Sequence, residues 1–363
     1  MTVLARYVNC AVSRCGSGEP IYGLTPGIGH LKDTRLPDEE LRRAQQVLVM
    51  THAGGIGSAL PTALVRAALM VRLNGIARGG SGASPAVAET LAAMLNAGVH
   101  PVVAETGSVG AGDLAQMAAI ALVAIGMGSA EHAGEVLPGA EALRRAGIGP
   151  LELEPKDGLA LVSANGISIG HGALVVARAA RVVDAADLTA ALSLEAIGGN
   201  PSVALPVVGR VKPFAGQVEA CRCILAALEG SYLLQPAAAT SIQDPLSFRV
   251  APQVHGALRE LLGFARRAVE TELNSQSDNP LVSVEDQAMV HNGNFHPIML
   301  ALAFDGLRGA IAHVGQLSER RMSTCGMASS ATSPASAPNH LARRSRGLPG
   351  CRCVIRPRPW PPS

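Results

Sequence analysis

The residues best suited to chemistry lie in a few glycine-bearing loops. The segment IYGLTPGIGHL places Tyr22 in a glycine-rich stretch that can present a phenol over a site. A Tyr-Gly pair by itself is more often a turn than a catalyst. The segment VMTHAGGIG puts His52 at a predicted helix end, where a lone histidine is more often a structural hydrogen-bonding residue. Neither motif decides its own function.

A second group of polar residues lies in SIQDPLSFRVAPQVHG, which concentrates Gln243, Asp244, Arg249, Gln253 and His255. Arg249 can clamp a carboxylate through its planar guanidinium group. An ion pair between Arg249 and Asp244 is the alternative. The segments ETELNSQSDNP and HNGNFHP, the latter containing Phe295, place amides at predicted helix ends, which alone indicates capping.

The segment ETGSVGAGDLAQMA, residues 105–118, predicts a glycine-rich loop that runs into the N-terminus of an apolar helix. Such a loop can bind an anion, separate two elements, or derive from a loop that forms its own cofactor. Its centre is Gly110, Ala111 and Gly112. No metal site is expected, because the seven cysteines form no CxxC pair with zinc-type spacing.

The elements that position these residues are predicted to be helices. Hydrophobic residues reach 48% but aromatic residues only 2%, a composition that favours closely packed helices over sheets. Ser84, Pro85 and Gly98 mark the ends of one helix. The stretch PDEELRRAQQVLVMTHAGG has acids in its first turn and glycines at its end. Longer helices are predicted near 168–198, 214–234, 253–275 and 297–321, with no strand-rich module.

Charge and targeting signals limit the partners. With 30 basic and 28 acidic residues the net charge is +2, so no nucleic acid is expected. The N-terminus lacks the long apolar region of a signal peptide. The most apolar helical run, MAAIALVAIGMG, is shorter than the roughly 20 residues of a membrane span. We therefore expect a cytoplasmic protein without a membrane segment.

The C-terminal residues break the helical pattern. From residue 328 to 363 there are seven prolines, six arginines and no acidic residue. Such a segment cannot bury enough apolar area to offset about 1–2 kcal/mol of backbone entropy per residue. Either a natural basic tail or a frame-shifted end explains this composition, and we favour the frame-shifted end. We expect domains at 1–165 and 166–325, followed by a disordered tail at 326–363.

Taken in order, the motifs resemble those of the histidine and phenylalanine ammonia-lyase family. They stand here as YGLTPGIG, THAGGIG, GSVGAGDL, QDPLSFR, SDNP, GNFH and SERR, and cover about residues 20–321. The resemblance implies a mostly α fold, a long-helix bundle of the fumarase and aspartase type with its C-terminal part missing. It also implies a homotetramer whose active sites combine several subunits.

The resemblance further implies a cofactor, 4-methylideneimidazole-5-one (MIO), which forms when an internal Ala-Ser-Gly cyclises and loses water. This electrophile captures the amino acid while a tyrosine removes a β-proton. Tyr22 matches the base, Arg249 the carboxylate anchor, and His52 the residue that recognises imidazole. Gln243 and Phe295 match other active-site positions. Asn165 matches the asparagine near the cofactor, with two extra residues before its Asn-Gly pair.

The departures from the family pattern bear on activity. Where the family has Gly-Ala-Ser-Gly-Asp, this chain has Gly110, Ala111, Gly112 and Asp113, so the serine is missing and MIO is not expected to form. Leu246 replaces a second active-site tyrosine. Three functions stay open: an ammonia-lyase that converts histidine or a related aromatic amino acid to an α,β-unsaturated acid, a 2,3-aminomutase, and an inactive homologue that binds a small amino acid or pairs with an intact paralogue.

Overall fold

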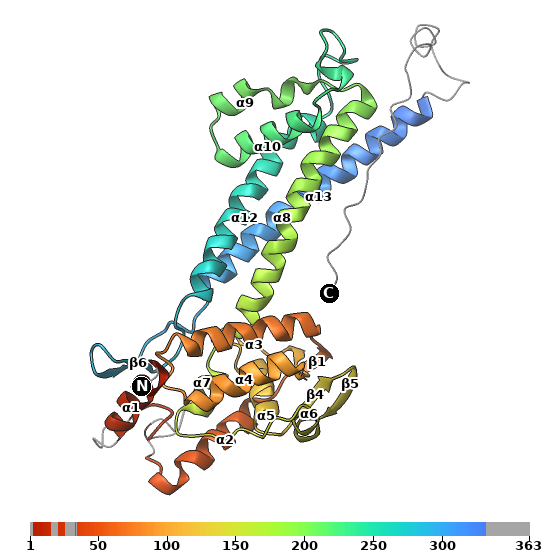
Figure 1. Cartoon of the computed structure of the whole chain (residues 1–363). Coiled ribbons are helices and arrows are strands. Elements are labelled where there is room, and N and C mark those ends of the chain that lie inside the picture. Colours follow the sequence, from red (N-terminus) through yellow and green to blue (C-terminus); the bar gives the residue numbers. More distant parts are fainter. Residues whose placement is uncertain (1–2, 16–20, 26–32, 34, 332–363) are drawn as a thin grey trace. The chain divides into compact units, whose positions relative to one another are not determined.

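The structure is a computed structural model that describes residues 3–15, 21–25, 33 and 35–331 (Figure 1). The glycines at 27 and 29 and the tail beyond residue 331 lie outside the described residues. The chain divides into two compact units, one of residues 1–185 and 257–312, the other of 186–256 and 313–363. Most described residues are helical, which confirms the predicted mostly α fold.

The first unit contains a group of short and medium helices together with parts of three long ones. The former are α1 (Val3–Cys15), α2 (Leu41–His52), α3 (Thr62–Ala77), α4 (Pro85–Ala97), α5 (Leu114–Ala124), α6 (Gly139–Arg145) and α7 (Asp157–Val162), with a 3-10 turn, η2, at Asp38–Glu40. The long helices are α8 (Gly166–Ile197), α12 (Ala251–Leu273) and α13 (Ile298–Ala331), each of which continues into the second unit.

Helix α4 shows how local chemistry sets helix ends. Pro85 occupies the first turn, where its missing N–H costs nothing. Gly98 ends the helix with a φ of 69°, a conformation that glycine adopts without steric penalty. Both ends match the prediction. Ser84, however, does not cap α4, because its hydroxyl donates to Asp157 at 2.7 Å.

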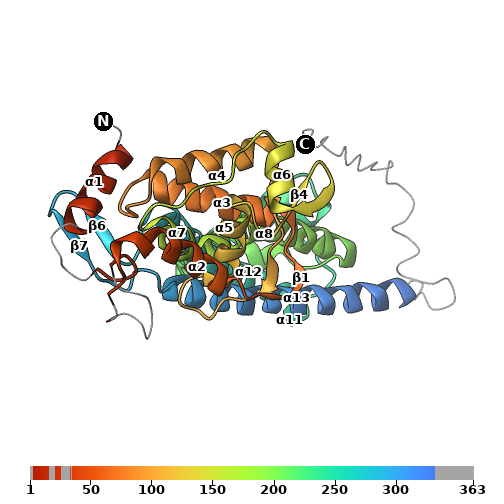
Figure 2. The same ribbon diagram turned by 90° about the horizontal axis from the view of Figure 1, so that it is seen from below.

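The core of the first unit is an apolar cluster drawn from α2 to α5 and α7. Helices α2, α5 and α7 pack against one another, and α3 packs against α4 (Figures 1 and 2). Leu69, Leu91, Met117 and Leu161 are fully buried here. This cluster fixes the helices whose ends carry the candidate site.

Within the described residues, three small antiparallel sheets occur that were not predicted. β1 (Ile56–Ala59) pairs with β3 (Ala104–Thr106), and β6 (Leu281–Ser283) pairs with β7 (Ala288–Val290). The third sheet has the order β2 (His100–Pro101), β4 (Ser129–His132) and β5 (Glu135–Pro138). Strands of two to four residues are too short to show an alternating pattern in the sequence.

The second unit contains η3 (Pro201–Ala204), α9 (Pro206–Val211), α10 (Ala215–Ala227), η4 (Tyr232–Leu234) and α11 (Leu246–Arg249). Helix α10 packs against α9 and η3. Leu194, Ile224, Leu228 and Phe248 form part of its apolar core. The unit is therefore a small helical assembly with its own buried centre.

The runs predicted near 168–198, 253–275 and 297–321 match α8, α12 and the start of α13, but two helix ends differ. The run predicted near 214–234 ends as α10 at Ala227, because the chain turns at Gly230, with a φ of 80°, before the separate 3-10 turn η4. α13 does not stop near residue 321 but continues to Ala331, inside the segment predicted to be a tail. The predicted domain boundary at residue 165 stays a prediction.

The absence of a membrane span was predicted from the short length of the apolar run MAAIALVAIGMG. Within the described residues, two helical stretches are longer than this run. Asp157–Ile197 and Ile298–Gly326 are long and apolar enough to cross a membrane by length and composition alone, so that premise is wrong. The most apolar part of the first stretch is 67% buried inside the protein, as in a core helix, and that of the second is 28% buried. Because core helices meet the same criterion, this finding alone assigns no membrane span.

Candidate active site

The loop between β3 and α5 folds back on itself. The Ser108 hydroxyl donates to the Gly112 carbonyl oxygen at 3.2 Å and accepts the Gly110 N–H at 3.3 Å. Gly110 and Gly112 have φ angles of 79° and 80°, which favour glycine. Ala111 lies exposed between them. The bend thus depends on the two glycines and on one serine upstream.

Asp113 joins this loop to the start of α8. Its N–H donates to the Ala164 carbonyl oxygen at 2.9 Å, and its carboxylate accepts both the N–H and the hydroxyl of Ser168, each at 2.7 Å. The first N–H groups of a helix have no partner within the helix and favour a negative charge. Asp113 therefore caps α8 rather than α5, the helix that follows it in sequence.

The carboxyl group of Asp113 is only 1% exposed. This burial raises its pKa above the ordinary value, and the hydrogen bonds from the Ser168 N–H and hydroxyl oppose part of the shift. A buried carboxylate is stable only with such partners.

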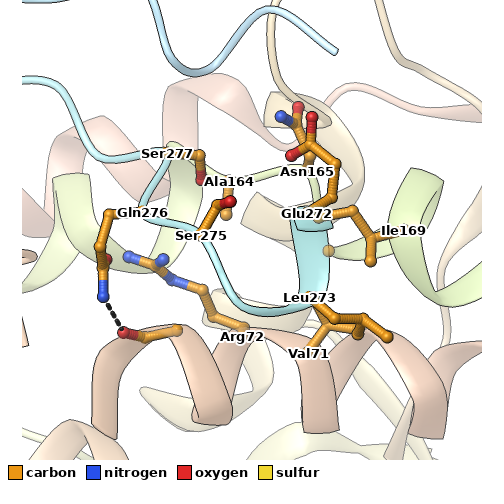
Figure 3. A pocket seen from close by; sticks show the side chains of 12 residues that line it. Val71, Arg72, Ala164, Asn165, Ile169, Glu272, Leu273, Ser275, Gln276 and Ser277 are labelled. Carbon is orange, nitrogen blue, oxygen red and sulfur yellow. Dashed lines mark hydrogen bonds between the residues drawn. The ribbon is translucent and has the colours of Figure 1, made fainter. Parts of the chain in front are cut away.

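Asn165 lies in the turn before α8 and lines a small pocket together with Arg72, Glu272 and Gln276 (Figure 3). The centre of a water molecule can occupy about 20 Å³ of this pocket. Asn165 is 1% exposed, and neither atom of its amide has a hydrogen-bond partner within the protein. Burial raises the pKa of Glu272. Asn165 thus offers an unpaired buried donor and acceptor.

His52 is the last residue of α2, and its Nδ1 lies 2.8 Å from the Leu48 carbonyl oxygen. A carbonyl oxygen can only accept, so Nδ1 carries the proton of a neutral ring and Nε2 is the acceptor. A Cβ atom on Gly55 would lie 2.9 Å from the Ala104 Cβ, so glycine allows β1 to approach β3. This pairing brings the end of α2 close to the loop that follows β3.

Tyr22 is half-buried, with its ring edge-to-face against that of His291 at a centroid distance of 6.5 Å. Its segment is anchored by Gln45 of α2. The Gln45 amide donates to the Gly23 carbonyl oxygen at 3.1 Å and accepts the Leu159 N–H at 3.0 Å. Gln45 is not among the predicted site residues, because a glutamine inside a helix carries no local signal for partners this distant.

The segments SDNP and HNGNFHP meet through their amides. Asn292 donates its side-chain N–H to the Asp278 carbonyl oxygen at 3.0 Å, and its backbone N–H to Asn279 at 3.0 Å. Asp278 also forms a buried ion pair with Arg72 of α3 at 2.8 Å. Phe295 lies half-buried in the turn before α13. These amides and this ion pair are structural partners of the turn that carries Phe295.

Two of the predicted site residues, Gln243 and Arg249, belong to the second unit. Gln243 is exposed, and Arg249 is half-buried at the last position of α11. Among the described residues, Arg249 makes no ion pair with Asp244, whose carboxylate accepts the Asn200 N–H at 2.6 Å. The alternative of an Arg249–Asp244 ion pair is therefore not observed. The remaining predicted residues, Tyr22, His52, Gly110, Ala111, Gly112, Asn165 and Phe295, belong to the first unit.

No cluster of three or more His, Cys, Asp or Glu side chains suited to a metal occurs in the part of the chain that the structure describes.

The fold is that of ammonia-lyases and aminomutases. The structure of ergothionase from Treponema denticola superposes with a TM-score of 0.84 at 30% identity, covering 88% of this chain and 64% of that one. The structure of phenylalanine aminomutase from Pantoea agglomerans superposes with a TM-score of 0.84 at 31% identity, covering 88% of this chain and 66% of that one.

Sequence comparison identifies the family. The model of the family described as aromatic amino acid lyase matches residues 4–349, and the chain belongs to this family. It is 44% identical to histidine ammonia-lyase of Gloeobacter violaceus over 84% of this chain and 59% of the relative. It is 43% identical to histidine ammonia-lyase of Stigmatella aurantiaca, over 86% of this chain and 62% of that relative. The chain thus spans about three fifths of the length of these relatives.

Proposed function

We propose that this chain binds histidine or a related aromatic L-amino acid, but does not form MIO and so does not eliminate ammonia by the route of its family. One observation carries the proposal. The loop reads Gly110, Ala111, Gly112 and Asp113, without the serine whose hydroxyl is lost when MIO forms.

The residues present do not fit that group. Ala111 and the two glycines have no hydroxyl to lose, so a ring closed at residues 110–112 would lack the exocyclic methylidene. Ser108 is no substitute, because it lies upstream of Gly110 and its hydroxyl bonds to both ends of the bend. Its downstream neighbour is Val109 rather than glycine.

The chain keeps side chains suited to holding an amino acid. Arg249 carries a permanent charge and a planar fork that matches a carboxylate. His52 presents Nε2 as an acceptor for an imidazole N–H. The other residues proposed to line the site are Tyr22, Asn165, Gln243 and Phe295.

Assembly into a homotetramer, with sites shared between subunits, is part of the proposal. Helices α8 and α13 expose large apolar side chains, among them Leu188, Leu192, Met299 and Leu302. Exposed apolar surface of this kind is typical of contacts between chains. We propose a cytoplasmic location, without membrane or nucleic acid partners.

An active enzyme is the second candidate, either a histidine ammonia-lyase or an aromatic 2,3-aminomutase. The relatives named histidine ammonia-lyase support the first, and the TM-score of 0.84 to a phenylalanine aminomutase supports the second.

Peptide mass spectrometry and ligand binding test the proposal together. We expect an unmodified peptide across residues 105–118, no near-ultraviolet absorbance of MIO, and calorimetric binding of L-histidine. Arg249→Gln should weaken that binding, whereas Arg210→Gln, at an exposed arginine of α9, should not. Loss of a water at residues 110–112, or release of an acrylate or β-amino acid from histidine, phenylalanine or tyrosine, would favour the enzyme.

A further inference from the structure

Arg321 of α13 is a buried cation in the second unit. It is 2% exposed, and its Nη1 donates to the Ser247 carbonyl oxygen of α11 at 3.2 Å. Its Nη2 has no hydrogen-bond partner within the protein. Arginine is rarely buried without a defined partner. The bond to α11 is thus the main contact that the structure gives this guanidinium group.

A carboxylate nearby compensates the charge. Asp187 of α8 is buried and lies 2.7 Å from Nδ1 of His255 on α12. Burial lowers the pKa of Arg321, and the charges of Cys325 and Asp187 oppose this shift. Asp187 thus pairs with His255 and attracts the charge of Arg321, so that buried polar groups of α8, α12 and α13 interact within this unit.

Helix α11 is a short turn that precedes α12, with Val250 alone between them. It has four residues, and short helices gain most of their stability from packing. Phe248 is 1% exposed and packs into the apolar core of the second unit. The Ser247 carbonyl, one residue earlier, receives the bond from Arg321. The turn is thus held by apolar packing, by its backbone link to α12 through Val250, and by the charge-assisted hydrogen bond from Arg321.

Arg249 follows Ser247 by two residues and ends the same turn. We propose that Arg321 is a positioning residue, which holds the α11 turn through the Ser247 carbonyl and so presets the direction of the Arg249 guanidinium group. The ligand part of this inference rests on the proposed function, in which Arg249 binds the carboxylate of the amino acid ligand.

Hydrogen exchange tests the positioning without any ligand. In Arg321→Gln, we expect faster exchange in the peptide across residues 244–250 and unchanged exchange in the core of the first unit. Arg320→Gln is the matched control, because Arg320 is adjacent and exposed and pairs with Glu319. Equal exchange at 244–250 in the native protein and Arg321→Gln would overturn the inference. Arg321→Lys, which keeps the charge without the planar fork, serves if the glutamine variant does not fold, and should show an intermediate increase.

Binding of two matched ligands tests the consequence. L-Histidine has the carboxylate, and L-histidinamide lacks it. A misdirected Arg249 should weaken L-histidine binding by about tenfold while leaving L-histidinamide binding unchanged. Equal weakening of both ligands would indicate a merely structural role and overturn the inference. If Arg249→Gln does not weaken L-histidine binding, the proposed anchor fails, and the exchange experiment still decides whether Arg321 holds the turn.

Discussion

The carboxylate of Asp113 and the first turn of α8 are joined through Ser168, whose backbone nitrogen and hydroxyl each lie 2.7 Å from an Asp113 oxygen. The two residues come from segments far apart in sequence. They link the loop at 110–112 to the turn that carries Asn165. The candidate site in the first unit therefore depends on a cap supplied by a distant residue.

Removing the Ser168 hydroxyl should destabilise the protein. In Ser168→Ala, the Asp113 carboxylate keeps its backbone partner but loses the hydroxyl, at a cost of about 1–3 kcal/mol. Urea unfolding of the variant and the native protein measures this difference. Ser323→Ala removes a hydroxyl from exposed α13 surface and should cost much less. Equal effects of the two substitutions would contradict the role of the cap.

Asp113 should also give stability a pH dependence of defined sign. Burial raises its pKa above 3.8, so the folded protein binds this proton more tightly than the unfolded chain. Ionisation of Asp113 then costs stability in full above the folded pKa, and this cost declines as pH falls below the folded pKa and disappears below the unfolded value of 3.8. Relative to Asp113→Asn, which cannot titrate, the native free energy of unfolding should rise between about pH 7 and about pH 4. A fall over this range would mean that the hydrogen bonds outweigh burial.

Restoring the serine should restore the cofactor chemistry at the loop. A Cβ atom on Gly110 would meet nothing within 4 Å, and one on Gly112 would make only ordinary contacts. The exposed bend at Gly110 and Ala111 thus leaves space for an inserted residue, whereas the positive φ angles of Gly110 and Gly112 disfavour side chains at those two positions themselves. Inserting serine between Ala111 and Gly112 recreates Ala-Ser-Gly, and we expect loss of one water from this peptide and new near-ultraviolet absorbance. Inserting alanine is the control. A folded serine variant without either signal would contradict the proposal that the missing serine alone prevents MIO formation.

The buried pair of Arg72 and Asp278 should matter more than an exposed pair of similar geometry. Their side chains are 3% and 1% exposed, against 71% and 49% for Arg42 and Glu154. Arg72→Met leaves a buried carboxylate unpaired and should cost about 3–5 kcal/mol. Arg42→Met should cost no more than about 1 kcal/mol. Chemical denaturation of both variants tests the ranking, and similar losses would refute it.

The sequence predicts the helices better than the contacts between them. The ends of α4 can be predicted from the sequence because Pro85 and Gly98 act on their own backbone. Strands of two to four residues leave no such pattern. Ser84 shows the limit of local rules, because its hydroxyl bonds to Asp157 rather than to its own helix.

The candidate site divides in the same way. The family motifs predict Tyr22 and Arg249 as candidates, but their supports were not predicted. Gln45 holds the segment of Tyr22, and Arg321 contacts the turn of Arg249, each across a long sequence separation. Such partners are set by tertiary packing, which neither composition nor helical period records.

Under the proposed function, in which His52 contacts the ligand ring, the bond between His52 and the Leu48 carbonyl oxygen has a consequence for ligand choice. Because Nδ1–H donates to the Leu48 carbonyl oxygen, a neutral His52 ring can accept a hydrogen bond only at Nε2. A bound neutral imidazole would have to direct its N–H towards Nε2 of His52, and its other ring nitrogen would be unprotonated. A phenyl ring offers no donor and would leave the Nε2 acceptor without a hydrogen bond, at a cost of about 1–3 kcal/mol if water is excluded from the contact. Discrimination between the two rings would then arise from the penalty on the wrong ligand rather than from extra attraction to the right one.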